Sequence, residues 1–258
     1  MAAVSPALSA KSTSRRICKR PVESSTVLHT FSTETMESDM GPSVNRRDCI
    51  LGCLTALMAD NALMADTALT QSVPPTLLVL GDSLSAEYGL AKGSGWVALL
   101  EQRLAMEKRA VKVVNASISG DTTSGGLVRL PALLKQHAPA ILVVELGGND
   151  ALRGLPLEMT RENLRAMVRL AQAAKAQVLL LGMQVPPNYG PDYAQQFAAS
   201  FATVAKEQKT ALVPFFLKDV ADAPNAADLF QSDRIHPTAA AHPILLNNVW
   251  PGLKRLLP

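Results

Sequence analysis

The chain has 258 residues, 48% of them hydrophobic, which is enough for one sizeable globular core. Its 25 Lys and Arg nearly balance 22 Asp and Glu, so it lacks the basic surface that a nucleic-acid-binding protein needs. All three cysteines precede Asp66, and the sequence beyond that residue therefore has no thiol for a disulfide, a nucleophile or a metal ligand.

The first 65 residues have the composition of a targeting segment. Residues 1–44 are rich in Ser and Thr without apolar periodicity, and we expect them to be disordered. Paired arginines at 46–47 precede an apolar run at 49–59, which is too short to span a bilayer. This order predicts a signal peptide cleaved after Ala59 or Ala65, and a mature protein that is periplasmic or secreted.

The export route stays open between two systems. The paired arginines followed by Ile50 and Leu51 resemble a twin-arginine signal, but Cys49 stands where Phe is usual, so Sec export is the other route. An uncleaved N-terminal anchor is the alternative to both. With the signal removed, we expect no stable membrane insertion.

From residue 75 onward, short strands and helices alternate. Continuous apolar runs predict buried strands at 77–80, 111–114, 141–146, 178–181 and 211–215. Helical spacing predicts helices at 96–108, 123–136, 160–174 and 193–206, and a last helix after Pro237 that Pro243 and Pro251 interrupt. Residues 75–258 should therefore form one α/β domain, a flavodoxin-like three-layer α/β/α fold with a five-stranded parallel sheet.

Four short polar blocks carry the functional signal. They are Gly-Asp-Ser-Leu at 81–84, Asn-Ala-Ser-Ile-Ser-Gly at 115–120, Gly-Gly-Asn-Asp at 147–150 and Asp-Arg-Ile-His at 233–236. The first three follow predicted strands, and ligands of such sheets bind beyond the carboxyl ends of the strands. Together the blocks hold the serine, the histidine, the acid and the N–H donors that a serine ester hydrolase requires.

Ser83 is the candidate nucleophile, and His236 is the candidate general base, since an imidazole takes up and returns a proton near neutral pH. The alternative for Ser83 is a helix N-cap or turn serine. Pro237 biases His236 away from helical geometry and can itself start the last helix. His137 and His242 compete as bases, but both are expected to be surface or helix-end histidines.

Asp233 is the candidate third member, because it can accept the other imidazole N–H and hold the tautomer. The alternative is that Asp233 and His236 are two ligands of a metal, but the blocks supply no further ligand, so we expect no metal. Asp82 and Asp150 also follow glycines at strand ends, and we expect them to make structural hydrogen bonds.

An oxyanion hole is expected from Gly120 and Asn149. A glycine lets its backbone N–H approach the substrate closely, and an asparagine amide adds a second donor. The backbone N–H of Ser83 would be the third. The alternatives are a turn glycine for Gly120 and a loop cap for Asn149.

The four blocks in this order resemble the SGNH/GDSL hydrolases. Longer stretches at 114–122, 129–137, 145–150 and 187–190 are similar to the bacterial periplasmic branch of thioesterase I, lysophospholipase and arylesterase. The resemblance covers residue 76 to the C-terminus. Glu87 departs from it, because this branch usually has Gly there, and the shape of the local loop is therefore in doubt.

The resemblance implies an SGNH hydrolase fold, no cofactor, and a monomer that cleaves small acyl esters and thioesters. It implies a Ser83–His236–Asp233 triad acting through an acyl-enzyme intermediate. A carbohydrate O-deacetylase of the same fold and a catalytically silent binding protein are the alternatives.

The substrate groove is expected beside the oxyanion hole. Residues 151–156 follow Asn149 as a loop, with Leu152 and Leu155 around a glycine, and could cover an acyl chain. Pro187 and Tyr189, after the fourth strand, would form the opposite wall. Alternatively, the leucines only pack the loop onto the following helix.

Overall fold

Strands and helices alternate along the chain as the sequence predicts. The computed structural model describes residues 73–258, and the predicted disordered extension and export signal within 1–65 lie outside the described residues. The strands are β1 (Thr76–Gly81), β2 (Lys112–Asn115), β3 (Ile141–Glu145), β4 (Gln177–Leu181) and β5 (Ala211–Val213). The longer helices are α1 (Trp96–Met106), α2 (Thr123–His137), α4 (Leu157–Ala173), α5 (Pro191–Glu207) and α7 (His242–Lys254). The short ones are α3 (Gly148–Leu152), α6 (Ala226–Leu229), η1 (Pro187–Tyr189) and η2 (Ala239–Ala241).

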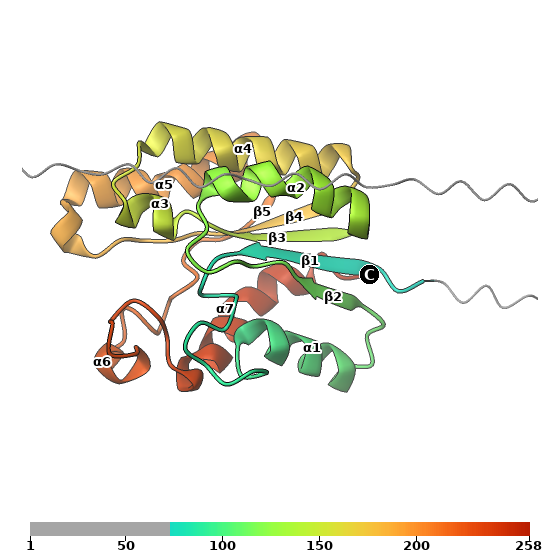
Figure 1. Ribbon diagram of the computed structural model, residues 1–258, viewed down its shortest axis with the longest axis horizontal. Helices are drawn as coiled ribbons and strands as arrows, with labels where there is room; N and C mark the ends of the chain where they lie inside the picture. The colour runs from blue at the N-terminus through green and yellow to red at the C-terminus, as the bar shows by residue number, and fades with distance from the viewer. Residues whose placement is uncertain (1–72) are drawn as a thin grey trace, which may run out of the picture. The chain divides into compact units, whose positions relative to one another are not determined.

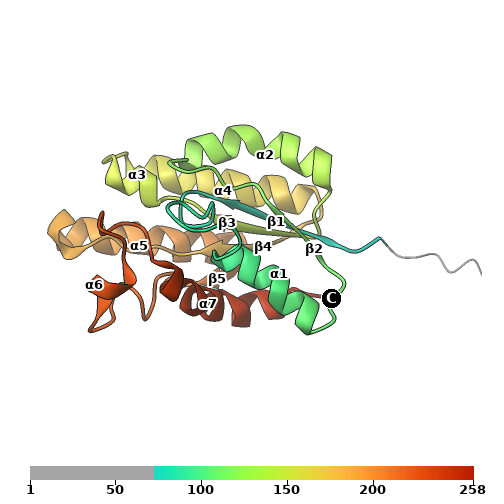
Figure 2. The same ribbon diagram turned by 60° about the horizontal axis from the view of Figure 1, so that its bottom comes forward.

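All five strands join one parallel sheet in the order β2-β1-β3-β4-β5. The central strands are almost completely buried, as continuous apolar runs require when helices cover both faces of a sheet. Figures 1 and 2 show α2, α4 and α5 on one face and α1 and α7 on the other. The three-layer α/β/α fold with a five-stranded parallel sheet is therefore confirmed.

The last helix differs from the prediction. It neither begins at Pro237 nor is interrupted, because α7 runs from His242 to Lys254 through Pro251. Pro243 lies in the first turn, where a missing N–H costs nothing. Pro237 instead forms an isolated bridge with Phe230, which closes the loop that carries His236.

A second difference is α3, a short helix where the sequence predicts a loop. It begins directly after Gly147, whose φ of 122° only glycine adopts without strain. Asn149 therefore lies on a helix rather than in a loop. Its place is set by the tight turn from β3 into α3.

The described residues include no helix of the length and apolar character that would cross a membrane.

Candidate active site

The four polar blocks meet at one edge of the sheet, beyond the carboxyl ends of the strands. Ser83 follows β1, Gly120 follows β2, and Asn149 lies on α3 after β3. Asp233 and His236 lie between α6 and η2, in the segment that approaches the same end of the sheet in Figure 1. All five residues named for catalysis from the sequence thus come together on one rim.

Three side chains form a continuous hydrogen-bonded series. The Ser83 Oγ lies 2.8 Å from His236 Nε2, and His236 Nδ1 lies 2.7 Å from Asp233 Oδ2. An ionised carboxylate only accepts, so Nδ1 carries the proton and Nε2 is left to accept from the serine hydroxyl. The arrangement can therefore withdraw a proton from Ser83.

Asp233 is held ionised by local donors. Its Oδ1 accepts the backbone N–H groups of His236 and Ile235, at 3.0 and 2.9 Å. The backbone N–H of His236, followed by its ring and the N–H of Ile235, lowers the pKa of Asp233 to about 2. Both oxygens of the carboxylate are therefore occupied by donors from Ile235 and His236.

Two further residues, which the sequence does not reveal, fix the histidine loop. The Tyr88 ring lies against the His236 ring, with centroids 4.3 Å apart. The Gln231 amide donates to the carbonyls of Tyr88 and Pro237, at 2.9 and 3.1 Å. Gln231 thereby ties the segment after Ser83 to the segment that carries His236.

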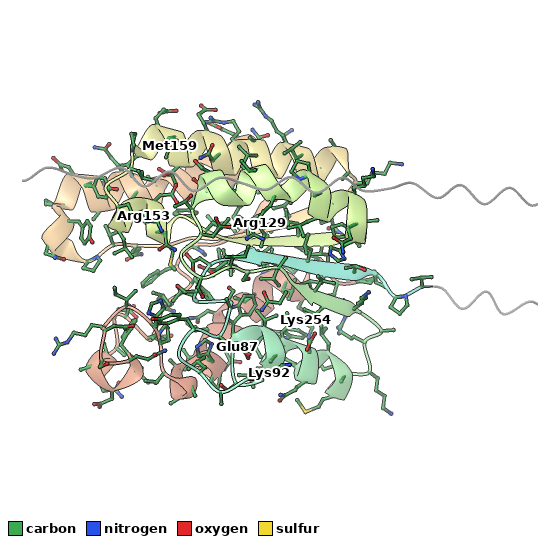
Figure 3. The ribbon with its side chains drawn as sticks, viewed as in Figure 1. Glu87, Lys92, Arg129, Arg153, Met159 and Lys254 are labelled. Carbon is green, nitrogen blue, oxygen red and sulfur yellow. The ribbon has the colours of Figure 1, made fainter. Side chains whose placement is uncertain are left out.

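Gly120 follows β2 and Asn149 lies in α3 after β3, and these two strands flank β1, which precedes Ser83. Gly120 has a φ of 77°, and its carbonyl accepts a 2.8 Å hydrogen bond from Arg153, which Figure 3 labels. The Asn149 amide nitrogen donates to Asp82 at 2.9 Å, which fixes its orientation. Among the described residues, the N–H groups of Ser83 and Gly120 donate to no acceptor, so they remain free for a ligand.

The two acids assigned to structure do make structural hydrogen bonds. Asp150 is fully buried and accepts from the backbone and hydroxyl of Thr123 and from the Thr160 hydroxyl, which joins α2 and α4. Asp82 accepts from the backbone N–H of Leu84 at 3.0 Å and from Asn149.

Glu87 shapes the loop that follows Ser83. It adopts a φ of 58°, a left-handed conformation that favours glycine. Its carboxylate accepts the backbone N–H groups of Gly93 and Gly95, at 3.0 and 2.8 Å (Figure 3). The chain thus keeps a glycine-type backbone at this position and adds a side chain that fastens the loop.

His242 is a buried histidine, and its expected surface position is wrong. It is 2% exposed, and its Nδ1 accepts the backbone N–H of Trp96 at 2.9 Å. Burial lowers the pKa of His242 to about 4, although Glu87 and the Pro237 carbonyl oppose this shift. The expected position at a helix end is correct, since His242 is the first residue of α7.

Exposed apolar side chains concentrate around the site. Nine large hydrophobic residues are exposed in the described part of the chain, and five of them lie on the loops and short helices that follow the strands at this rim. They are Tyr88, Ile118, Leu152, Tyr189 and Ile235. Of the predicted groove residues, Leu152 and Tyr189 are exposed, Leu155 is half-buried, and Pro187 lies in η1.

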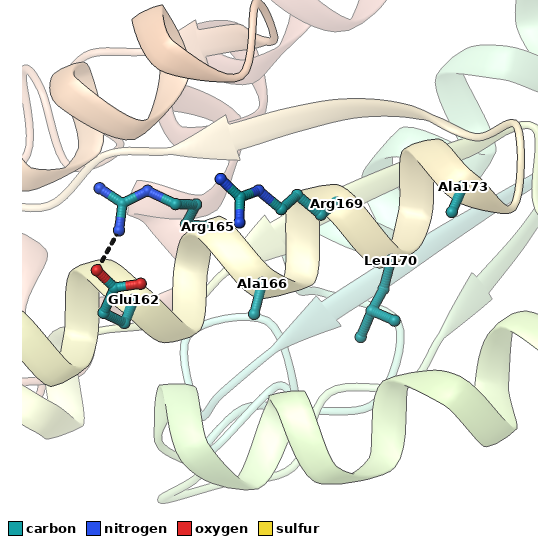
Figure 4. Close-up of a pocket in the computed structure, with 6 residues that line it drawn as sticks. All are labelled: Glu162, Arg165, Ala166, Arg169, Leu170 and Ala173. Atoms are coloured by element: carbon teal, nitrogen blue, oxygen red, sulfur yellow. Dashed lines mark hydrogen bonds and ion pairs between the residues drawn. The ribbon is translucent and has the colours of Figure 1, made fainter.

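Two surface hollows lie away from this rim. One is lined by residues of α4 alone and includes Arg165, which pairs with Glu162 (Figure 4). The other lies between α1 and α7. No group of three potential metal-ligating side chains occurs among residues 73–258.

The sequence matches a family model and several characterised proteins. The model of the GDSL-like lipase/acylhydrolase family matches residues 79–244. Esterase TesA of Pseudomonas aeruginosa is 52% identical over 204 residues, which cover 79% of this chain and all of that protein. Thioesterase 1/protease 1/lysophospholipase L1 of Escherichia coli K12 is 46% identical, over 66% of this chain and 79% of that protein.

A solved structure agrees with these matches. The psychrotrophic esterase EstA from Pseudoalteromonas, in a structure inhibited by monoethylphosphonate, superposes with a TM-score of 0.66. It is 42% identical and covers 70% of this chain and 97% of its own.

His242 makes stability depend on pH. Because its pKa falls from about 6.5 in the unfolded chain to about 4 when folded, acid protonates the unfolded state first. We expect the free energy of unfolding to fall as pH drops from 6.5 to 4, by roughly 2–3 kcal/mol from this residue. His242→Gln, which cannot be protonated, should remove that part of the slope in urea unfolding.

The wild type must be compared with His242→Gln because Asp82 changes the free energy of unfolding with pH in the opposite direction. Burial raises the pKa of Asp82 to about 6, so its protonation favours the folded state as pH falls from 6 towards 3.8. His137→Gln, at the end of α2, is the matched control and should keep the wild-type slope. An unchanged slope in His242→Gln would contradict the assignment.

Proposed function

The chain belongs to the GDSL-like lipase/acylhydrolase family and is a carboxylic ester hydrolase, and from this premise we propose that Ser83 is its nucleophile. The observation that carries the proposal is the series of hydrogen bonds from Ser83 through His236 to Asp233. Inhibition of the related esterase EstA by a phosphonate is consistent with a serine nucleophile.

The first half of the reaction acylates the serine. The Ser83 Oγ attacks the substrate carbonyl carbon while its proton passes to His236 Nε2. Asp233 stabilises the imidazolium through the bond to Nδ1. The proton then moves from Nε2 to the leaving alcohol or thiol, the bond from the carbonyl carbon to the leaving group breaks, and an acyl-Ser83 ester remains.

The second half releases the acid. Water takes the position of the leaving group, gives a proton to His236 Nε2 and attacks the acyl-Ser83 carbonyl. The tetrahedral intermediate collapses, and the proton returns to the Ser83 Oγ. A carboxylic acid leaves, and the enzyme is restored without any cofactor.

Negative charge on the carbonyl oxygen is stabilised by three donors. These are the backbone N–H groups of Ser83 and Gly120 and the side-chain amide of Asn149. The support for this hole is the free state of the two N–H groups and the fixed amide orientation. Removal of one such donor typically costs about 3–4 kcal/mol in the transition state.

Acyl esters and thioesters with an apolar chain are the proposed substrates. The named activities of the relatives are esterase, thioesterase and lysophospholipase. The exposed side chains of Leu152 and Tyr189 support an acyl-chain site, in which the segment with Leu152 and Leu155 forms one wall and the η1 segment, residues 187–189, forms the other. A carbohydrate deacetylase would not need this apolar rim, because an acetyl group is short and a sugar is polar.

Export to the periplasm or the medium is also proposed, as is a monomeric state. The support for export is the apolar run at residues 49–59 behind paired arginines.

Replacing triad residues tests the mechanism. We expect Ser83→Ala and His236→Ala each to lower kcat by several orders of magnitude, and the double variant to lose little more, because the residues act as one unit. Asp233→Asn should keep weak but measurable turnover. The measurement is hydrolysis of a chromogenic acyl ester by residues 66–258. Wild-type turnover by Ser83→Ala, or phosphonate labelling of another serine, would show the nucleophile to be wrong.

A charge on the rim tests acyl-chain selection. Leu152 is 44% exposed, so Leu152→Asp should leave the fold intact and weaken apolar contact with the chain. We expect kcat/KM for octanoyl esters to fall by about tenfold or more relative to acetyl esters, since each buried methylene is worth roughly 0.8 kcal/mol. Val128→Asp, at a remote exposed site on α2, is the control. Equal losses of kcat/KM for both esters would instead indicate that Leu152 only packs the loop onto the following helix.

N-terminal sequencing tests export. The protein recovered from the periplasm or medium of a bacterial host should begin at Asp60 or Asp66, free of cysteine. An intact N-terminus in a membrane fraction would identify an uncleaved anchor.

A further inference from the structure

Two buried carboxyl groups lie directly beneath the nucleophile. Glu145 is the last residue of β3 and pairs in register with Gly81, so Asp82 emerges beside it. Glu145 is fully buried and Asp82 is 2% exposed. The triad makes no use of either acid.

No cation compensates this pair. The ion pairs found in the described part of the chain include neither Asp82 nor Glu145. Two adjacent buried carboxylates without a cation cannot both remain ionised, because desolvation and repulsion both favour protonation of one of them. The pair therefore holds one proton at neutral pH.

The proton belongs on Glu145. Burial, and then the charge of Asp82, raise the pKa of Glu145 well above its ordinary value. Burial also raises the pKa of Asp82, but only to about 6, because donors from Leu84 and Asn149 oppose the shift. Glu145 Oε1 has no hydrogen-bond partner among residues 73–258, whereas Oε2 only accepts. Oε1 is thus the oxygen free to carry the proton.

Glu145 holds the residues on both sides of Ser83, one through its backbone and one through its side chain. Its Oε2 accepts the Asp82 backbone N–H at 3.3 Å and the Ser85 hydroxyl at 2.8 Å. The Ser85 hydroxyl in turn accepts the Trp96 indole N–H at 3.1 Å. Ser83 lies between the two residues held in this way.

Asp82 extends the support to the amide of the proposed oxyanion hole. One oxygen accepts the Leu84 backbone N–H at 3.0 Å, and the other accepts the Asn149 amide at 2.9 Å. An ionised acceptor strengthens both bonds. It also compels the Asn149 nitrogen, rather than its oxygen, to face Asp82, so the second amide hydrogen remains available.

We propose that Glu145 and Asp82 are positioning residues that share one proton, so that a neutral Glu145 holds the Ser83 turn and an ionised Asp82 orients the Asn149 amide. This inference rests on the proposed serine mechanism. Glu145 and His236 are the titratable groups that influence Asp82, and the Asp82 charge additionally favours the imidazolium formed during attack.

Infrared spectroscopy tests the shared proton without any use of activity. Wild-type protein at pH 7 should show the C=O stretch of one buried, protonated carboxylic acid, and Glu145→Gln should lose that band. Because a Gln side-chain oxygen can accept the same two hydrogen bonds as a neutral Glu, Glu145→Gln should lower kcat less than Glu145→Ala, which removes the acceptor. Absence of the band in wild type, or its persistence in Glu145→Gln, would overturn the assignment of the proton.

A double-mutant cycle tests positioning. Asn149→Ala should lower kcat by about 10²–10³-fold with little change in KM. Asp82→Asn places an NH₂ group against either the Leu84 N–H or the Asn149 amide, which are both donors. The Asn149 amide should then be misplaced, and kcat should fall roughly 10–100-fold. In the Asn149→Ala background the same Asp82 change should cost much less, because its effect passes through Asn149.

The cycle has its own controls. Asp192 is an exposed acid at the start of α5, and Asp192→Asn should leave kcat unchanged in both the wild-type and the Asn149→Ala background. If Asp82→Asn does not fold, Asp82→Ser takes its place, since it removes the carboxylate without adding an amide. Equal costs of the Asp82 change in both backgrounds would refute positioning. An inactive wild type would refute the proposed function. The infrared band would still show whether Glu145 carries the proton.

Discussion

The parallel pairing of β1 with β3 decides where Ser83 and Asn149 lie relative to each other. Its register aligns Gly81 with Glu145, so the chain leaves both strands at the same level of the sheet. Ser83 and Asn149 therefore arise from adjacent strand ends, although 66 positions separate them in the sequence. Loops that start from a buried, fully hydrogen-bonded sheet inherit its rigidity, which is what a preorganised site requires.

Buried carboxyl groups hold the elements at this edge of the sheet together through hydrogen bonds rather than through ion pairs. Asp150 joins α2 to α4 through two threonines, and Asp82 joins the turn at Ser83 to α3. Each carboxylate is satisfied by N–H and O–H donors, which is the condition under which a buried polar group is not destabilising. The same low-dielectric surroundings that make such bonds strong also shift the pKa values of Asp82 and Glu145 upward.

The histidine loop depends on contacts made at long range. Gln231 and Tyr88 hold it against the segment after β1, and Gly89 permits this, since a Cβ there would lie 2.1 Å from Gln231 Oε1. His236 thus reaches Ser83 from a part of the chain more than 150 residues away. Exposed apolar side chains, among them Tyr88 and Ile235, surround this junction.

The sequence by itself determined the strand and helix alternation, the parallel sheet, and the meeting of Ser83, Gly120 and Asn149 at one rim, whereas it linked Asp233 and His236 to them only through the resemblance to a family. Periodicity and short polar blocks are local signals, and parallel topology brings strand ends together without further information. Only the tertiary structure decided the burial of His242 and Glu145, the helix at α3, and the contacts of Tyr88 and Gln231. Those features depend on which neighbours surround a side chain, and neighbours distant in sequence leave no local pattern to read.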